Sequence, residues 1–348
     1  MSSESADYRE ATPAPAFEEP LATLLEPAAE SEPGLDTDTE PDAAIETREL
    51  RVTSAQHGQR LDKVLVSMAP EFSRSHLQGL IDRALVRVDG EVAATASRRL
   101  RVAQRVQVEL APTDESQAFK PQAMALQVLY EDEHLLVLDK PAGLVVHPAP
   151  GNWQGTLLNG LLARDPAAAA LPRAGIVHRL DKDTSGVMMV GRTLPAVTAL
   201  VRSIAAREVH RSYLALAHGV PERVDFDIDA PIGRDPQVRV RMAVVAGGRD
   251  SRTSVVCLGD ADGYSALRCT LHTGRTHQIR VHLAHVGHPL VADSVYGGRP
   301  ALGMQRQALH ATELRLAHPI TGEALAFNCP APADFAAAWA QVAPGVID

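Results

Sequence analysis

Apolar residues recur with the i, i+3, i+4, i+7 spacing of an amphipathic helix in two short stretches, residues 61–68 and 77–81. Pro70 stops the first of these helices, and Ser73 or Ser75 can cap the second. The spacing therefore predicts a pair of short helices.

Strands are expected directly after this pair. Residues 85–93 alternate apolar and polar side chains around Asp89-Gly90, a preferred dipeptide for a two-residue hairpin turn. Residues 105–110 alternate in the same way. We therefore predict a small α+β domain over residues 48–111.

Basic residues are spread over this small domain. They suit a groove that touches phosphate groups, but the solvated surface of a generic small domain would account for them equally well. They are Arg60, Lys63, Arg74, Arg83, Arg87, Arg98, Arg99, Arg101 and Arg105.

The larger region, residues 121–348, consists of short apolar stretches separated by Gly/Pro turns. A helix is expected over residues 194–208, with Pro195 in its first turn. Strands outnumber helices and do not alternate regularly with them, which favours an α+β fold over a doubly wound sheet. The expected strands are 126–132, 134–141, 186–193, 212–219, 253–258 and 264–271, and the apolar run 174–177 is a further candidate.

Charge is distributed unevenly along the chain. Residues 1–47 contain 13 acidic residues against the single Arg9, so the whole-chain charge of -9 leaves +3 for the remainder. This acidic tail lacks a sustained apolar period and is predicted to be disordered, and residues 112–120 are predicted to be a linker. Residues 48–111 hold 11 basic and 7 acidic residues, an excess compatible with a nucleic-acid partner.

Composition narrows the protein class. Aromatic residues make up only 4%, which argues against binding nucleic acid chiefly by stacking, and three widely spaced cysteines fit a reducing compartment without a disulfide framework. No apolar run approaches the length of a membrane span, and the acidic N-terminus does not resemble a signal peptide. We expect a cytoplasmic protein without a membrane anchor and, since no heptad pattern is present, a monomer.

Residues 178–186, HRLDKDTSG, place five ionisable side chains in nine positions between two apolar runs. Asp181 lies between Arg179 and Lys182, and cationic neighbours favour the ionised carboxylate that a nucleophile or general base requires. A turn with solvated charges is the alternative interpretation.

A second concentration of polar residues spans 272–289, HTGRTHQIRVHLAHVGHP. We expect a helix there with Ile279, Leu283 and Val286 on its inner face. Its polar side would carry Arg275, His277, Arg280 and His282.

The histidines of this segment raise the possibility of a metal site. His282, His285 and His288 are three residues apart, but no acid or cysteine in the segment completes a ligand set. Structural histidines are the better interpretation, and a metal-dependent hydrolase is kept as an alternative. Phosphate-binding loops, dinucleotide-binding glycine motifs and serine-hydrolase elbows are missing, which argues against ATP use, nicotinamide chemistry and serine hydrolysis.

Taken in order, the motifs resemble those of the bacterial RNA pseudouridine synthases that modify ribosomal and transfer RNA. HRLDKDTSG resembles the motif of the catalytic aspartate, and residues 58–108 resemble the αL-type RNA-binding domain that precedes the catalytic domain in several members. The resemblance implies a catalytic domain built on a mainly antiparallel sheet with flanking helices. The other matching stretches are LDKPAGLVVHP, RSYLALAHG, TGRTHQIRVHLAHVGHPLVAD and QALHATELRLAHP.

The resemblance also implies roles for residues. Asp181 matches the essential aspartate, Arg280 the basic residue that pairs with it, and Tyr213 the tyrosine that lies against the target base. The aspartate would attack C1′, as in retaining glycosidases, or remove a sugar proton to give a glycal. Neither route requires a cofactor or a metal.

Further residues are implied to bind the substrate. Arg179 matches the arginine that fills the place of the flipped base, while His178 and Thr184 would shape its loop. The full set expected on the RNA side is Arg179, His178, Thr184, Arg275, His277 and Arg74. The expected partner is large-subunit ribosomal RNA, free or in an assembling particle; transfer RNA, or a non-catalytic RNA-binding or ribosome-assembly role, is the alternative.

Overall fold

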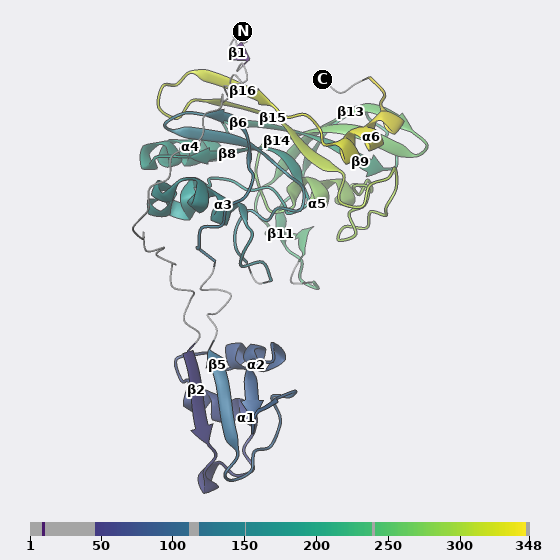
Figure 1. Cartoon of the computed structure of the whole chain (residues 1–348). Coiled ribbons are helices and arrows are strands. Elements are labelled where there is room, and N and C mark those ends of the chain that lie inside the picture. Colours follow the sequence, from purple (N-terminus) through teal and green to yellow (C-terminus); the bar gives the residue numbers. More distant parts are fainter. Residues whose placement is uncertain (1–8, 11–45, 111–117, 150, 239–240, 346–348) are drawn as a thin grey trace, which may run out of the picture. The chain divides into compact units, whose positions relative to one another are not determined.

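The computed structural model describes residues 9–10, 46–110, 118–149, 151–238 and 241–345 (Figure 1). The chain divides into two compact units, one within Glu18–Ala118 and one formed by Phe119–Asp348 together with Met1–Phe17. Each unit is described separately.

The small unit contains the predicted helix pair and hairpin. Ser73 caps the second helix by accepting a hydrogen bond from the His76 amide, and Asp89 and Gly90 both have positive φ, at 55° and 86°, as the tight hairpin turn requires. The four strands pair in the order β2-β5-β3-β4, and every pairing is antiparallel. The elements are β2 (Glu46–Arg51), η1 (Ser54–Gln56), α1 (Leu61–Met68), α2 (Arg74–Asp82), β3 (Val86–Val88), β4 (Glu91–Val92) and β5 (Arg105–Leu110).

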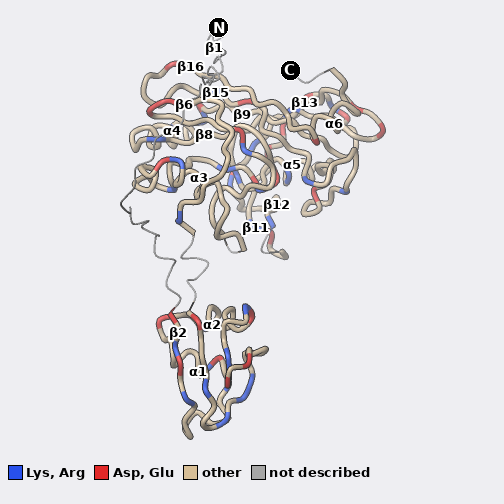
Figure 2. The backbone as a smooth tube through the Cα atoms, in the orientation of Figure 1, with Lys and Arg blue, Asp and Glu red and all other residues tan. Residues whose placement is uncertain are grey.

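One core holds this unit together, because the apolar stripes of both helices face the inward residues of β3 and β5. Lys and Arg residues lie beside acidic ones around this core (Figure 2), and several form ion pairs with them. The core residues include Leu61, Leu65, Leu77, Leu80, Val86, Val88, Val106 and Val108.

The predicted disordered tail needs two corrections. Strand β2 begins at Glu46, so the small unit starts inside the range assigned to the tail, because Glu46 and Thr47 pair with the end of β5. Arg9–Glu10 forms strand β1, which runs parallel to β16. The remainder of the predicted tail lies outside the described residues, as does most of the predicted linker.

The larger unit is built on a ten-stranded sheet, with the main order β10-β13-β14-β9-β15-β8-β7-β6. Pairing is antiparallel except between β15 and β8 and between β1 and β16, which confirms the mainly antiparallel α+β prediction. A two-stranded sheet, β11 (Ile232–Arg234) with β12 (Met242–Val244), lies outside the main path. The main strands are β6 (Gln127–Glu131), β7 (Leu135–Lys140), β8 (Ser185–Gly191), β9 (His210–His218), β10 (Asp225–Asp229), β13 (Arg252–Ala261), β14 (Tyr264–Leu271), β15 (Leu309–Ala317) and β16 (Ala324–Asn328).

Strand β9 shows how the sheet separates two cores. Tyr213 and Ala215 belong to the larger core, which also receives Ile279 and Leu283 of a helix. Leu214 and Leu216, one residue out of phase, belong to a second core around Phe335 and Trp339. Side chains alternate across a strand, so the candidate residue Tyr213 faces the layer of the first core.

The helices of this unit are short. They are α3 (Leu157–Arg164), α4 (Leu194–Ala206), α5 (Gln278–His285) and α6 (Ala333–Val342), with 3₁₀ turns η3 (Pro166–Ala170) and η4 (Pro172–Gly175). The predicted helix at α4 is confirmed, with Pro195 in its first turn. The sheet and these helices are visible in the upper part of Figure 1.

The prediction of a strand at residues 174–177 is wrong. Pro172 starts the turn η4 there, and Ala174 and Gly175 have positive φ, at 53° and 82°, which bends the chain out of an extended path. Gly175 is required because a Cβ at this position would lie 1.9 Å from the Gly191 carbonyl oxygen. Only Ile176 continues as an isolated bridge, to Val190.

Candidate active site

Asp181 lies on the short loop that leads into β8. The turn is closed by the Thr184 amide, which donates to the Asp181 carbonyl over 3.1 Å. Lys140, at the end of β7, is fully buried and its Nζ donates to the carbonyls of Lys182, Pro141 and Leu144 at 2.7–3.0 Å. Lys140, in the stretch LDKP, is therefore buried away from solvent and holds the loop that carries Asp181 in place.

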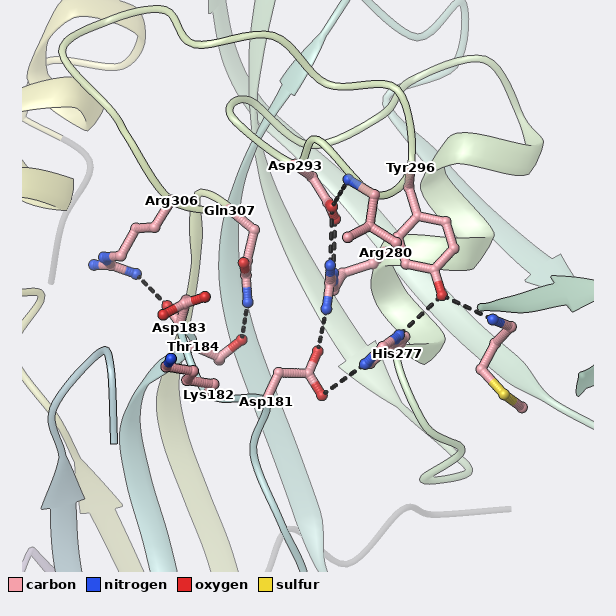
Figure 3. A network of polar contacts seen from close by, with 12 residues as sticks. Asp181, Lys182, Asp183, Thr184, His277, Arg280, Asp293, Tyr296, Arg306 and Gln307 are labelled. Atoms are coloured by element: carbon pink, nitrogen blue, oxygen red, sulfur yellow. Dashed lines mark hydrogen bonds and ion pairs between the residues drawn. The ribbon is translucent and has the colours of Figure 1, made fainter. Parts of the chain in front are cut away.

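Side-chain hydrogen bonds from two further residues also hold this loop. Arg306 donates from Nη1 to the Asp183 carbonyl over 2.8 Å, and Gln307 reaches the Thr184 hydroxyl at 3.4 Å (Figure 3). Burial lowers the pKa of Lys140 to about 8, against the opposing influence of Asp183 and Asp181. Lys140 thus still carries most of its charge at neutral pH.

The two carboxylate oxygens of Asp181 have different surroundings. Oδ2 accepts a hydrogen bond from Arg280 Nη1 at 3.0 Å, while Oδ1 lies 3.8 Å from His277 Nε2 (Figure 3). The Asp181 side chain is 14% exposed and that of Arg280 is 7% exposed. One oxygen is therefore engaged, and the other faces His277 without a full hydrogen bond.

Asp293 anchors Arg280 from the opposite side. Its carboxylate accepts from Arg280 Nε at 2.7 Å and from Nη2 at 2.9 Å, a two-bond arrangement that fixes the guanidinium plane. The Arg280 guanidinium also lies 5.0 Å from the Tyr296 ring centre. Burial opposes the charge of Arg280, but the hydrogen bonds to Asp293 and the charge of Asp181 more than offset it and raise its pKa.

Tyr213 and Arg211 come from neighbouring positions of β9. Tyr213 is 6% exposed, and burial raises the pKa of its phenol. Arg211 is 7% exposed, and its Nε has no hydrogen-bond partner within the described part of the chain. Its Nη1 occupies the space beside Gly274, 2.8 Å from where a Cβ would stand.

His178 supports the loop instead of presenting an exposed base. Its Nε2 accepts from the Met189 amide at 3.0 Å. Burial, aided by the charge of Arg211, lowers the pKa of His178 to about 3, so that the ring is neutral at physiological pH. Arg179, the next residue, is exposed.

The other predicted substrate residues are distributed more widely. Arg275 donates to the Asp250 carbonyl at 3.3 Å, at the turn that precedes α5. Arg74 belongs to the small unit, where it donates to the buried Asp62 at 2.6 Å with 54% of its side chain exposed. The structure therefore brings together Asp181, Arg280 and His277 within the larger unit, whereas Arg74 belongs to the small unit.

The expected faces of the histidine-rich helix need correction. Ile279 and Leu283 are buried as predicted, but Val286 follows α5 and is 38% exposed. Arg280 and His282 are expected on a polar side but are buried. Asp293 accepts hydrogen bonds from Arg280, and both ring nitrogens of His282 have hydrogen-bond partners, so their burial leaves these polar groups satisfied.

Two of the three histidines considered as metal ligands have structural partners, and the third, His285, is exposed. His282 bonds Thr253 Oγ1 at 2.9 Å and the Ala230 carbonyl at 3.0 Å, and His288 Nδ1 lies 3.1 Å from the His218 carbonyl. Among the described residues, no group of three His, Cys, Asp or Glu side chains is arranged to hold a metal ion. No helix in the described ranges is long and apolar enough to cross a membrane.

Part of this network has no individual signal in the sequence. Asp293 ends the stretch TGRTHQIRVHLAHVGHPLVAD without a predicted role, and Tyr296, Lys140 and Arg306 are not among the predicted site residues. The only sequence signal was that Lys140 and Asp293 fall inside motif-like stretches. Their contacts join segments more than 10 residues apart, so that spacing alone could not assign them.

The sequence matches two known protein families and several named relatives. Residues 134–285 match the RNA pseudouridylate synthase family, and residues 59–106 match the S4 domain. The ribosomal large subunit pseudouridine synthase D of Nitrosomonas europaea is 46% identical over 299 residues, covering 84% of this chain and 86% of that protein. The protein of the same name from Xanthomonas campestris pv. campestris is 48% identical over 300 residues, covering 82% of this chain and 90% of that protein.

A solved structure shares the fold. Human RNA pseudouridylate synthase domain containing 4 has a TM-score of 0.50 at 24% identity, covering 62% of this chain and 92% of that one. The resemblance noted from the sequence motifs is confirmed, and the metal-dependent hydrolase alternative is set aside. The chain belongs to the RNA pseudouridylate synthase family, with an S4 domain ahead of its synthase domain.

Proposed function

We propose that this enzyme converts uridine to pseudouridine in large-subunit ribosomal RNA and that Asp181 is the reacting carboxylate. The observation that carries the proposal is the asymmetry of Asp181, with Oδ2 held by Arg280 at 3.0 Å and Oδ1 without a full hydrogen bond. The names of the relatives from Nitrosomonas and Xanthomonas support large-subunit RNA as the substrate.

The chemistry requires four bond changes. The N1–C1′ bond of the uridine breaks, a C5–C1′ bond forms, the proton on C5 is lost, and N1 gains a proton. Asp181 would attack C1′ or take a sugar proton to give a glycal, and in either route the uracil stays in the site and is turned before rejoining. Arg280 would supply fixed positive charge beside the carboxylate, with Asp293 holding its orientation.

The target uridine must leave its stack before Asp181 can reach the sugar. Exposed Arg179, two residues before Asp181, would fill the vacated position, since its guanidinium can stack on bases. Tyr213 would lie against the flipped uracil. His178 and Thr184 would hold the loop in shape through their bonds to Met189 and Gln307.

Phosphate contacts are proposed for the remaining cations. Arg211 is a buried guanidinium without a counter-ion in the described chain, and an RNA phosphate would relieve the cost of its burial. Arg275 and the exposed part of Arg74 would add contacts from their own units. A cytoplasmic location is part of this proposal, because ribosomal RNA would be met there; the monomeric state stays a prediction.

Tritium release from [5-³H]uridine-labelled RNA tests the proposal. We expect wild-type protein to release tritium from large-subunit RNA and much less from transfer RNA, and Asp181→Asn to release none. More release from transfer RNA than from large-subunit RNA would make transfer RNA the substrate. Tight RNA binding by wild type without tritium release would favour the non-catalytic RNA-binding alternative.

A further inference from the structure

His277 is held in an unusual backbone conformation next to Asp181. Its φ of 56° lies in the left-handed region, at the residue that precedes α5. A non-glycine residue in this region is strained and persists only where surrounding contacts hold it. With this backbone conformation, the His277 ring lies next to the loop that carries Asp181, and its Nε2 is 3.8 Å from Asp181 Oδ1.

Tyr296 lies against one of the two ring nitrogens of His277. The Tyr296 oxygen accepts from the Met242 amide at 3.1 Å and lies 2.9 Å from His277 Nδ1 (Figure 3). The phenol has a single hydrogen, and His277 Nδ1 is the acceptor that the described residues offer it. When the phenol donates to Nδ1, the neutral ring bears its hydrogen on Nε2.

The surroundings of His277 agree with a neutral ring of this form. Burial lowers the pKa of His277, while the charge of Asp181 opposes the shift. The other charged groups that face it are Arg280, Asp293 and Arg179, two cations and one anion. The rings of His277 and Tyr296 meet edge to face, with centres 5.7 Å apart, which restricts rotation of the imidazole.

We propose that His277 and Tyr296 are positioning residues of the reaction: Tyr296 fixes the Nε2–H form of His277, and this N–H directs the second oxygen of Asp181. Arg280 holds Oδ2, and His277 faces Oδ1 at a distance that orients the oxygen without occupying it with a full hydrogen bond. The carboxylate thereby keeps one orientation while Oδ1 stays available to the ribose. This inference rests on the proposed function of Asp181.

The pair His277→Gln and His277→Asn separates this role from a purely structural one. A Gln amide nitrogen reaches the place of Nε2, whereas an Asn amide nitrogen reaches only the place of Nδ1. Asn suits left-handed backbone better than Gln does. If the N–H matters, Gln retains activity better; if only the backbone matters, Asn does.

We expect kcat for tritium release to fall about 100-fold in His277→Asn and about tenfold in His277→Gln, with KM changed less than about twofold. Tyr296→Phe keeps the ring beside Arg280 but loses the hydroxyl, and should lower kcat about tenfold. Circular dichroism melting of each variant checks that the fold is retained.

The ¹⁵N NMR signals of His277, assigned by their loss in His277→Gln, report its tautomer in the absence of RNA. Wild type should show a protonated Nε2, and Tyr296→Phe should show a mixture. A protonated Nδ1 in wild type, or better activity in the folded Asn variant than in Gln, would overturn the inference. A wild type that releases no tritium would instead overturn the proposed function, whatever tautomer the NMR spectrum shows.

Discussion

Asp62 in the small unit and Asp181 in the catalytic unit are both carboxylates held by arginines, yet their surroundings differ. Asp62 has no exposed surface, and both of its oxygens are engaged, by Arg60 at 3.0 Å, Arg74 at 2.6 Å and Gln78 at 3.1 Å. These bonds, led by the one from Arg60, lower the pKa of Asp62 strongly.

Asp181 accepts one hydrogen bond from Arg280, through Nη1. The other donors of this guanidinium, Nε and Nη2, bind the second carboxylate, Asp293. Asp293 takes the structural part of the interaction, with its side chain 1% exposed and two bonds to the guanidinium. A carboxylate whose two oxygens are both hydrogen-bonded, such as Asp62, stabilises the fold. A carboxylate with one oxygen free of a full hydrogen bond, beside a cation of fixed orientation, is available for chemistry.

The largest expected effect comes from removing the cation that joins the two acids of the catalytic unit. Arg280→Met leaves Asp293 buried without its partner, which should lower the free energy of unfolding by about 3–5 kcal/mol. Tritium release should fall by more than about 10³-fold. Urea unfolding measures the stability and the tritium assay measures the activity. Arg280→Lys keeps the charge but not the planar guanidinium, so its stability and activity should lie between those of wild type and Arg280→Met. Full stability in the Met variant would contradict the role given to Asp293.

A smaller loss of stability is expected in the small unit. Arg60→Ala combined with Arg74→Ala removes two partners of Asp62, but these arginines are 40% and 54% exposed, so water can reach the carboxylate in their place. The small unit should exchange its α1 amide hydrogens faster, while kcat stays within about twofold of wild type and KM for RNA rises, because Arg74 is a proposed RNA contact. A large fall in kcat with unchanged exchange would show that the two carboxylates are not separated in function as proposed.

Arg211 provides a test on the substrate side. Arg211→Met should weaken RNA binding about tenfold and make the slope of log K against log salt less steep by about 1, as expected for one lost phosphate contact. Binding is measured with Asp181→Asn as background, so that no turnover occurs. Arg202→Met, at an exposed position of α4, is the matched control. An unchanged salt slope, together with a lower kcat when Arg211→Met is made alone in active enzyme, would assign Arg211 to the uracil instead.

The smallest effect near neutral pH concerns the loop that carries Asp181. The folded pKa of His178 is about 3, below the ordinary value of 6.5, so unfolding takes up a proton between these two values. The free energy of unfolding should therefore decrease as pH falls from about 6.5 towards 3, by at most about 1.4 kcal/mol per pH unit for this group. His178→Gln keeps an acceptor for the Met189 amide without titrating, and its urea midpoint should depend less on pH. Equal pH dependence in both proteins would contradict the assignment.

Much of the fold could be predicted because local pattern and tertiary structure agree. The helix pair, the Asp89-Gly90 hairpin and the main strands each carry their own periodicity or turn residues. The error at residues 174–177 has a clear cause: an apolar run indicates burial, but the backbone there turns because Gly175 packs against the Gly191 carbonyl. That close approach depends on β8, which the run itself does not reveal.

The site was predictable only where its chemistry was concentrated in the sequence. Asp181 and Arg280 come from dense polar motifs and do meet in space. Asp293 and Tyr296 lie on a turn after α5 whose short sequence shows no charge cluster, and their importance arises from contacts to Arg280 and His277. Arg211 begins the motif-like stretch RSYLALAHG, but a buried cation whose Nε has no partner can be recognised only in three dimensions.

The most direct test of the central claim measures stability and catalysis in the same preparation of Asp181→Asn. We predict that tritium release from labelled large-subunit RNA is abolished while the free energy of unfolding stays within about 0.5 kcal/mol of wild type. Release by the variant would show that another group is the reacting one. A strongly destabilised variant would show that Asp181 is a structural carboxylate like Asp62, and would contradict the distinction drawn between them.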